Sequence, residues 1–307
     1  MQTEMQSLPS IVSAGEALID LIRVDGDCWI SKVGGGPWNV ARAAASLGVP
    51  SAFAGSISQD WFGDALWSAS TWAKIDLRFI QRVPQPPLLA VVHQLTPPAY
   101  TFIGSSSADL AFDPSQLPAG WQNAARWVHF GGISLARPPL SETLLALAQQ
   151  LKAQGVRISY DPNYRTIMTS DYDPMLHKMV RLADVIKVSD EDLVDLFRTP
   201  SPDHGLACLR DMNPDAVVML TQGERGAHLH VGEQSWHAAP PPVDIIDTIG
   251  AGDACMAGLL CSLLQRPGEA WPAHLRFAVA AGAAACLNAG ATPPTPAQVA
   301  DLIDRII

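Results

Sequence analysis

The sequence predicts an α/β protein with a mostly parallel central sheet. From Trp127 onward, short apolar runs typical of buried strands alternate with longer runs that have helical periodicity. Parallel strands need crossover helices between them, so this alternation favours a parallel sheet. Of the 307 residues, 48% are hydrophobic and only 16% are charged, which indicates a well-packed globular chain. Length alone does not decide between one large core and two domains.

The first third of the chain contains strand and helix signals in the same alternating style. Three glycines at 34–36 lead into Pro37, a residue suited to the first turn of a helix, and the Ala-rich run that follows ends at Gly48. The apolar runs 88–95 and 99–103 flank Thr96-Pro97-Pro98 and predict a hairpin. The other elements expected here are strands at 10–14, 18–24 and 51–57 and a helix over 60–73.

The second part of the chain predicts most of the parallel sheet. We expect Ser141 to cap a helix that buries Leu144, Leu147, Ala148 and Leu151 on one face. Polar residues at 161–165 follow a strand directly, at the end of the strand where open α/β sheets bind ligands. The remaining elements are strands at 127–131, 156–160, 185–188, 216–220 and 227–231, a tightly packed helix at 277–287 and a closing helix over 297–307.

Charge and cysteine content narrow the classes of function. The formal net charge of -10 gives no support for binding to nucleic acid or to an anionic membrane surface. The five cysteines are scattered and lack C-x-x-C spacing, so neither a disulfide framework nor a zinc site is indicated. No stretch is long and apolar enough to cross a bilayer. We therefore expect a cytoplasmic protein whose anionic ligands are held by a local site.

Such a site is predicted by the segment Asp247-Thr248-Ile249-Gly250-Ala251-Gly252-Asp253, which follows the apolar run 243–246 and opens a helical pattern. The first N–H groups of a helix lack partners and carry partial positive charge, and glycines let an anion approach the backbone. A carboxylate beside an anion cradle makes chemical sense if Asp253 takes a proton from a second reactant, as phosphoryl transfer requires. The alternative is a plain helix start in which Asp253 complements the dipole.

Together with Gly34-Gly35-Gly36-Pro37-Trp38-Asn39-Val40-Ala41, this segment resembles the two signatures of the ribokinase-like (PfkB) carbohydrate kinase family. A dinucleotide fold is disfavoured because G-x-G-x-x-G is absent. The resemblance implies a single domain over residues 1–307, folded as a three-layer sandwich. It also implies a small β lid, formed by about 17–33 and 88–104, through which two subunits pair.

The resemblance implies an ATP-dependent sugar kinase with Mg²⁺ as cofactor. Asp253 would be the general base, and the Gly250, Ala251 and Gly252 segment would stabilise charge on the transferred group. The residues implied to hold the sugar are Asp20, Gly35, Gly36, Asn39 and Arg165. Those implied to bind ATP are Lys187, Ser189, Thr221, Gly223, Gly226 and Asn288.

Two metal sites are more weakly indicated. Many family members carry Asn-x-x-Glu where this chain has Ser189 and Asp192, so Asp192 is either a metal contact or part of an N-terminal helix cap. Asp247 and Ile249 lie where some members bind a monovalent cation, which raises K⁺ activation as a hypothesis.

The identity of the sugar is predicted from the absence of a basic residue at one position of the lid. Family members that act on 2-keto-3-deoxygluconate commonly carry a lid Arg that pairs with the carboxylate, whereas Gly104 falls near that position here, so a neutral sugar such as fructose is favoured. Fructokinases usually retain that Arg too, so its absence also points to a divergent substrate. The segments 129–135 and 187–191 also resemble fructokinases. The alternatives are a 2-keto-3-deoxygluconate kinase, a catalytically silent sugar or nucleotide sensor, and a nucleoside kinase, for which Trp38 and Trp61 leave an aromatic slot open.

Overall fold

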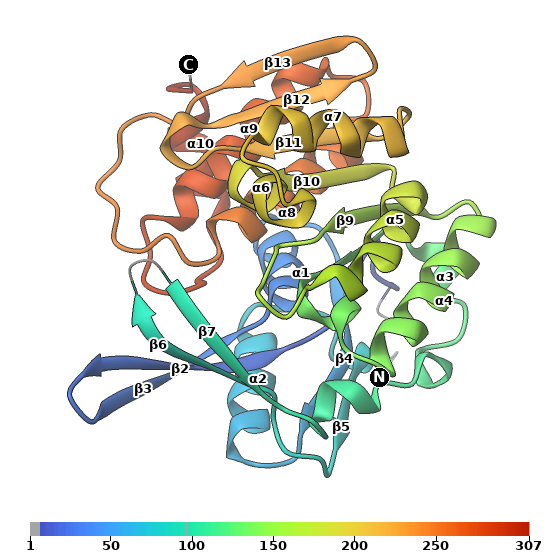
Figure 1. Cartoon of the computed structure of the whole chain (residues 1–307), viewed down its shortest axis with the longest axis vertical. Coiled ribbons are helices and arrows are strands. Elements are labelled where there is room, and N and C mark those ends of the chain that lie inside the picture. Colours follow the sequence, from blue (N-terminus) through green and yellow to red (C-terminus); the bar gives the residue numbers. More distant parts are fainter. Residues whose placement is uncertain (1–6, 96–97, 307) are drawn as a thin grey trace, which may run out of the picture.

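The computed structural model describes residues 7–95 and 98–306. Within these ranges the centre is a nine-stranded sheet in the order β13-β12-β11-β10-β9-β8-β1-β4-β5 (Figure 1). Its strands are β1 (Ile11–Ala14), β4 (Ser51–Ser58), β5 (Ile80–Val83), β8 (Trp127–Gly131), β9 (Arg157–Asp161), β10 (Val185–Ser189), β11 (Val217–Thr221), β12 (Ala227–Val231) and β13 (Gln234–Ala238).

The pairing from β5 to β11 is parallel, as the alternation of strands and helices predicts, whereas β12 and β13 are antiparallel. Strand β1 lies inside the sheet, between β4 and β8, with Ile11 opposite both Ser51 and Trp127. Because parallel strands end at the same edge, the residues that follow β1, β8, β9 and β10 are brought together there. That edge carries the cavities described below.

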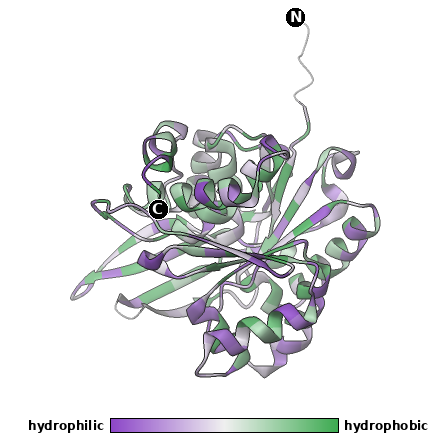
Figure 2. Ribbon diagram, turned by 90° about the horizontal axis from the view of Figure 1, so that it is seen from above, coloured by the Kyte–Doolittle hydropathy of each residue, from purple (hydrophilic) through white to green (hydrophobic). Residues whose placement is uncertain are grey.

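Helices cover both faces of the sheet, which gives three layers (Figure 2). Alternate strand residues point to opposite faces, so Val12 belongs to a core built with α3 to α7 and Ile11 to a second core built with α1, α8, α9 and α10. The helices are α1 (Gly36–Ser46), α2 (Trp61–Trp72), α3 (Trp121–Ala124), α4 (Leu140–Ala153), α5 (Asp173–Leu182), α6 (Asp190–Phe197), α7 (Pro202–Met212), α8 (Ala251–Gln265), α9 (Trp271–Ala285) and α10 (Pro296–Ile303).

A second sheet of four strands, in the order β3-β2-β6-β7, projects from the body of the molecule (Figure 1). Its strands are β2 (Leu18–Asp25), β3 (Cys28–Gly34), β6 (Leu89–Leu95) and β7 (Pro98–Ile103). Strands β6 and β7 pair as the expected hairpin, and the turn at Thr96 and Pro97 lies outside the described residues. Leu18 and Ala90 are buried, whereas Trp29 and Ile30 are exposed on the β2–β3 hairpin.

One local prediction is wrong. Ser141 does not cap α4, because that helix already begins at Leu140 and its N-cap is Pro139, with no side-chain cap bond. The apolar run 243–246 before the glycine motif is irregular backbone. The chain has no strand between Ala238 and Gly250, Ile245 and Ile246 are exposed, and three prolines at 240–242 cannot donate to a strand ladder.

No helix in the described ranges is long and apolar enough to cross a membrane. Across the same ranges the five cysteines are free thiols, in agreement with the absence of a disulfide pattern in the sequence.

Candidate functional site

Two cavities meet at the carboxyl edge of the central sheet. The smaller one has a volume of about 300 Å³, and its lining includes Asp20 of the small sheet, Asn39 of α1 and Asp253 of α8. The larger one has a volume of about 760 Å³ and lies beside β11, α8 and α9. Thr248 and Gly252 line both cavities, so the glycine motif forms the boundary between them. The geometry suits two ligands that react at this boundary.

The glycine motif forms the start of α8, as its sequence predicts. Gly250 is the N-cap with φ of 81°, a left-handed conformation in which a Cβ would also lie 2.9 Å from the Ala291 Cβ. The amides of Gly252 and Asp253 donate to no acceptor among the described residues. These two N–H groups at the positive end of a 15-residue helix form a ready site for an anion.

Asp253 is held in the smaller cavity by a residue from the other end of the chain. Its Oδ2 accepts a hydrogen bond of 2.9 Å from Nδ2 of Asn39, which α1 carries. Burial raises the pKa of Asp253 to about 6, against the lowering effects of the Asn39 hydrogen bond and of the Lys187 and Arg165 charges. A carboxylate with this pKa is largely ionised at neutral pH and remains basic enough to accept a proton.

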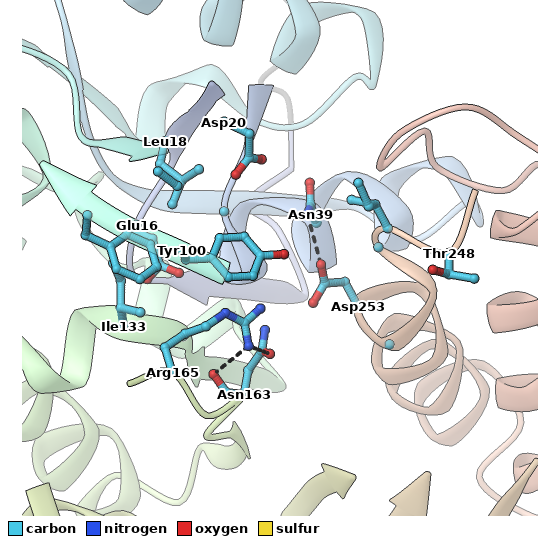
Figure 3. A pocket seen from close by; sticks show the side chains of 18 of the residues that line it. Glu16, Leu18, Asp20, Asn39, Tyr100, Ile133, Asn163, Arg165, Thr248 and Asp253 are labelled. Carbon is cyan, nitrogen blue, oxygen red and sulfur yellow. Dashed lines mark hydrogen bonds between the residues drawn. The ribbon is translucent and has the colours of Figure 1, made fainter. Parts of the chain in front are cut away.

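The other residues predicted to hold a sugar also line the smaller cavity. Asp20 comes from β2, Gly35 and Gly36 from the start of α1, and Arg165 from the segment after β9 (Figure 3). Burial raises the pKa of Asp20 to about 6, with Arg165 acting in the opposite direction. A Cβ on Gly36 would make ordinary contacts with Nδ2 of Asn163 at 3.4 Å and Oδ1 of Asp253 at 3.6 Å, so glycine leaves the space between these side chains free. The structure therefore brings all five predicted residues together with Asp253.

Arg165 is fixed by its own segment. Its Nη1 donates to Oδ1 of Asn163 at 2.7 Å and to the carbonyl oxygen of Tyr164 at 2.6 Å. Its Cζ lies 5.1 Å from the ring centroid of Tyr100, a residue of the small sheet. Figure 3 shows Tyr100 above Arg165 and Asn163, so β7 and the segment after β9 form two facing walls.

A buried ion pair supports the boundary between the cavities. Nζ of Lys187 lies 2.7 Å from Oδ2 of Asp161, and both residues are nearly inaccessible to solvent. Burial alone would lower the pKa of Lys187, but the Asp161 and Asp192 carboxylates raise it above its ordinary value, so the lysine stays charged. A Cβ on Gly252 would lie 3.3 Å from Nζ, which places this cation directly behind the glycine motif.

Only some of the residues predicted to bind ATP line the two cavities. Thr221, Gly223 and Gly226 line the larger cavity, and Lys187 lines the smaller one. Ser189 and Asn288 are not among the lining residues of either cavity. Ser189 caps α6, and Asn288 bonds to Ala284 and Gln298.

The two weaker metal predictions have different local geometries. Asp192 and Ser189 form a capping box, and the other Asp192 oxygen accepts the Tyr164 amide at 2.8 Å, so both carboxylate oxygens already bind backbone N–H groups. Asp247 accepts the amides of Ile249 and Gly290. Within the described residues no group of three His, Cys, Asp or Glu side chains could hold a metal ion.

Sequence reasoning missed three residues of the smaller cavity, which are Glu16, Tyr100 and Phe102; Asn163 and Thr248 also line it and lie in segments that were predicted to bind ligands. A signal existed for Glu16, because a carboxylate directly after the first buried strand lies at the ligand-binding edge. Trp38 and Trp61 do not line the cavity. The first is fully buried, with its ring N–H bonded to Ser70, and the second is 68% exposed on α2. The aromatic residues that do line it are Tyr100 and Phe102.

The chain is similar in sequence and in fold to known proteins. The family model described as "pfkB family carbohydrate kinase" matches residues 8–298. A fructokinase of Vibrio alginolyticus is 32% identical over 296 residues, covering 92% of this chain and 95% of that protein. The structure of a fructokinase from Vibrio cholerae O395 with fructose, ADP and calcium ion bound has a TM-score of 0.84 at 30% identity, covering 96% and 99% of the two chains. Aminoimidazole riboside kinase of Salmonella enterica, complexed with aminoimidazole riboside and an ATP analog, has a TM-score of 0.84 at 26% identity, covering 95% and 99%.

Proposed function

The chain belongs to the pfkB family of carbohydrate kinases, and on that premise we propose that it transfers the γ-phosphoryl group of ATP to a hydroxyl of a neutral sugar such as fructose. The observation that carries the proposal is the junction of two cavities at Thr248 and Gly252, with Asp253 on the side of the smaller one. A sugar in the smaller cavity and a nucleotide in the larger one would meet at this junction.

Asp253 acts as the general base. Asp20, Gly35, Gly36, Asn39 and Arg165 surround the sugar, and Oδ1 of Asp253 takes the proton of the hydroxyl group that attacks. As the new oxygen–phosphorus bond forms, the bond from the γ-phosphorus to the ADP oxygen breaks. The free amides of Gly252 and Asp253 and the Lys187 ammonium stabilise the negative charge that develops on the phosphoryl oxygens.

ATP fits the larger cavity. Its polar wall contains Thr221 and Gly223, and the glycine motif at its end supplies N–H donors for phosphates. ATP bound with Mg²⁺ supplies the transferable phosphoryl group and neutralises part of its charge. Both carboxylate oxygens of Asp192 already accept backbone N–H groups, so we assign Mg²⁺ to the phosphates of ATP. The role that remains for Asp192 is indirect, because its charge raises the pKa of Lys187. A K⁺ ion near Asp247 and Ile249 stays a prediction.

The small sheet acts as the lid of the sugar cavity. Leu18, Asp20, Ala90, Tyr100 and Phe102 all come from its strands and line the cavity, so a sugar would be enclosed between this sheet and the body. Enclosure keeps water from competing for the phosphoryl group. The exposed Trp29 and Ile30 on the β2–β3 hairpin support homodimer formation through the lid. The cytoplasm, where ATP is available, stays the predicted location.

Fructose is favoured over a sugar acid by the charges in the smaller cavity. Glu16, Asp20 and Asp253 are acidic, Lys187 is already paired with Asp161, and Arg165 alone remains to meet a carboxylate. Near Gly104, the Arg137 guanidinium is engaged by the buried Asp109. A riboside is the second candidate, because Tyr100 and Phe102 offer an aromatic wall and the similar Salmonella enterica kinase was solved with such a ligand.

An ADP-release assay with ATP and Mg²⁺ tests the proposal. The acceptors are fructose, tagatose, ribose, 2-keto-3-deoxygluconate and aminoimidazole riboside, each assayed in KCl and in NaCl. Saturable turnover with fructose and little with the sugar acid is expected, with a higher rate in KCl. Turnover restricted to the riboside would replace fructose, whereas sugar binding without any turnover would favour the silent sensor.

A further inference from the structure

Glu16 is a buried acid in the sugar cavity for which the phosphoryl-transfer step gives no role. It follows Gly15 at the end of β1, in the middle of the central sheet, and its side chain is only 3% exposed. In Figure 3 Glu16 lies on the far side of Tyr100 and Arg165 from Asp253. It therefore lines the end of the cavity remote from the base.

The fold builds a niche around this carboxyl group. A Cβ on Gly132, which has φ of 65°, would lie 2.0 Å from Oε1 of Glu16. Oε2 accepts the Ser134 amide at 3.2 Å and also the Ser134 hydroxyl. Both Gly132 and Ser134 follow β8, the neighbour of β1 in the sheet, so two adjacent strand ends enclose the group.

No cation of the described residues is paired with the buried carboxyl group of Glu16. Among the described residues, Glu16 takes part in none of the ion pairs, and the nearby Asp109 carboxylate disfavours its ionisation further. Burial raises the pKa of Glu16 to about 7. A buried carboxyl without a counter-charge is unfavourable for folding, and a glutamine could occupy the same volume without that cost.

We propose that Glu16 is a specificity-determining residue that hydrogen-bonds a hydroxyl group of the sugar at the end of the cavity remote from Asp253. The inference rests on the proposed function and extends it, because it assigns the recognition of a hydroxyl group that is not phosphorylated. Oε2 is taken by Ser134, so Oε1, beside Gly132, faces the sugar. A sugar lacking that hydroxyl would leave Oε1 of Glu16 without a polar partner and would be rejected.

The test pairs variants of Glu16 with sugars that each lack one hydroxyl group. Wild type, Glu16→Gln and Glu16→Ala are assayed against fructose and its monodeoxy analogues at saturating ATP. For wild type, one analogue should show a kcat/KM lower by about 100-fold, within the range expected when one buried polar group is left unpaired. For Glu16→Ala, the kcat/KM for fructose should fall by a similar factor, through a higher KM. The kcat/KM of Glu16→Ala for that same analogue should be no lower than its kcat/KM for fructose.

Two controls separate recognition from folding. Glu233→Gln changes an exposed glutamate and should leave every sugar unaffected. Glu16→Gln keeps the volume of the side chain, and its thermal unfolding shows that the protein is folded. The KM for ATP should stay within about twofold of wild type in both Glu16 variants.

The outcomes distinguish this inference from the proposed function. Two results would overturn the role of Glu16 and leave the proposed function standing, provided that wild type phosphorylates fructose. In the first, every analogue loses the same factor in kcat/KM in Glu16→Ala as in wild type. In the second, the KM for the sugar is unchanged in both Glu16 variants. A folded wild type that phosphorylates none of the neutral sugars would overturn the proposed function and this inference with it. Non-additive loss at one hydroxyl position supports both.

Discussion

Nδ2 of Asn39 donates a 2.9 Å hydrogen bond to Oδ2 of Asp253, although 214 positions separate the two residues. The bond leaves the other carboxylate oxygen, Oδ1, facing Gly36, whose Cβ position is 3.6 Å away. Because glycine places no side chain there, Oδ1 is the oxygen that can reach a hydroxyl in the cavity. Asn39 thus orients the base as well as lining the cavity.

The first prediction concerns the base. Asp253→Asn keeps the shape of the side chain but cannot accept a proton, so kcat should fall by about 10²–10⁴-fold. ADP binding, measured by calorimetry, should stay nearly normal because the amides at the start of α8 remain. Asp301→Asn, an exposed change on α10, is the control. Turnover close to wild type in Asp253→Asn would remove Asp253 from its role.

The second prediction concerns pH. Burial raises the pKa of Asp253 to about 6, and only the ionised form accepts a proton, so kcat/KM should fall as the pH drops through about 6. The Asn39 hydrogen bond lowers this pKa, and Asn39→Leu should therefore move the acid limb of the profile to higher pH. The comparison is between the two profiles measured with the same sugar. Coinciding limbs would show that Asn39 does not act on the base.

The third prediction concerns the ion pair of Lys187 and Asp161. Lys187→Met leaves Asp161 buried without its partner, which should lower the free energy of unfolding by about 3–5 kcal/mol. Adding Asp161→Asn should recover most of this stability but not the turnover, because the cation behind the glycine motif is still missing. Urea unfolding and kcat check both parts. Recovery of turnover in the double variant would contradict the catalytic role of Lys187.

The fourth prediction concerns the anion cradle. Gly252→Ala puts a methyl group 3.2 Å from Cε of Lys187, at the wall shared by both cavities. Alanine favours the helix by about 1 kcal/mol over glycine, so the protein should stay folded while kcat falls by at least about 10-fold. Gly268→Ala is the matched control, since its Cβ would meet nothing within 4 Å. A fully active Gly252→Ala would argue against phosphates at this position.

The fifth prediction tests the cost of burying Glu16. Its pKa is about 7 in the folded protein against an ordinary value of 4.5. Between these pH values the folded state holds a proton that the unfolded chain has released, so stability falls as the pH rises through this window. Glutamine does not titrate. The free energy of unfolding of Glu16→Gln should therefore rise relative to that of wild type between pH 5 and pH 8, by up to about 3 kcal/mol. A pH-independent difference in unfolding free energy would show that Glu16 is not titrating there.

The sequence by itself determined the class of fold and the chemical centre of the site. Buried strands alternating with crossover helices specify a parallel sheet, and such a sheet places its functional residues at one edge. The segment from Asp247 to Asp253 carries its own helix start, glycines and acid, so its role as an anion cradle with a base is readable locally. The nearby stretch at 243–246 shows the limit of this approach, because this apolar run is irregular backbone with Ile245 and Ile246 exposed.

Only the tertiary structure decided which side chains meet. Ser134 contacts Glu16 from 118 positions away, and Lys187 pairs with Asp161 because β10 lies beside β9. Trp38 is buried and Trp61 exposed, although both looked equally suited to line a pocket. These contacts depend on the order of strands in the sheet and on the position of the small sheet above it, which result from long-range packing and leave no mark in local periodicity.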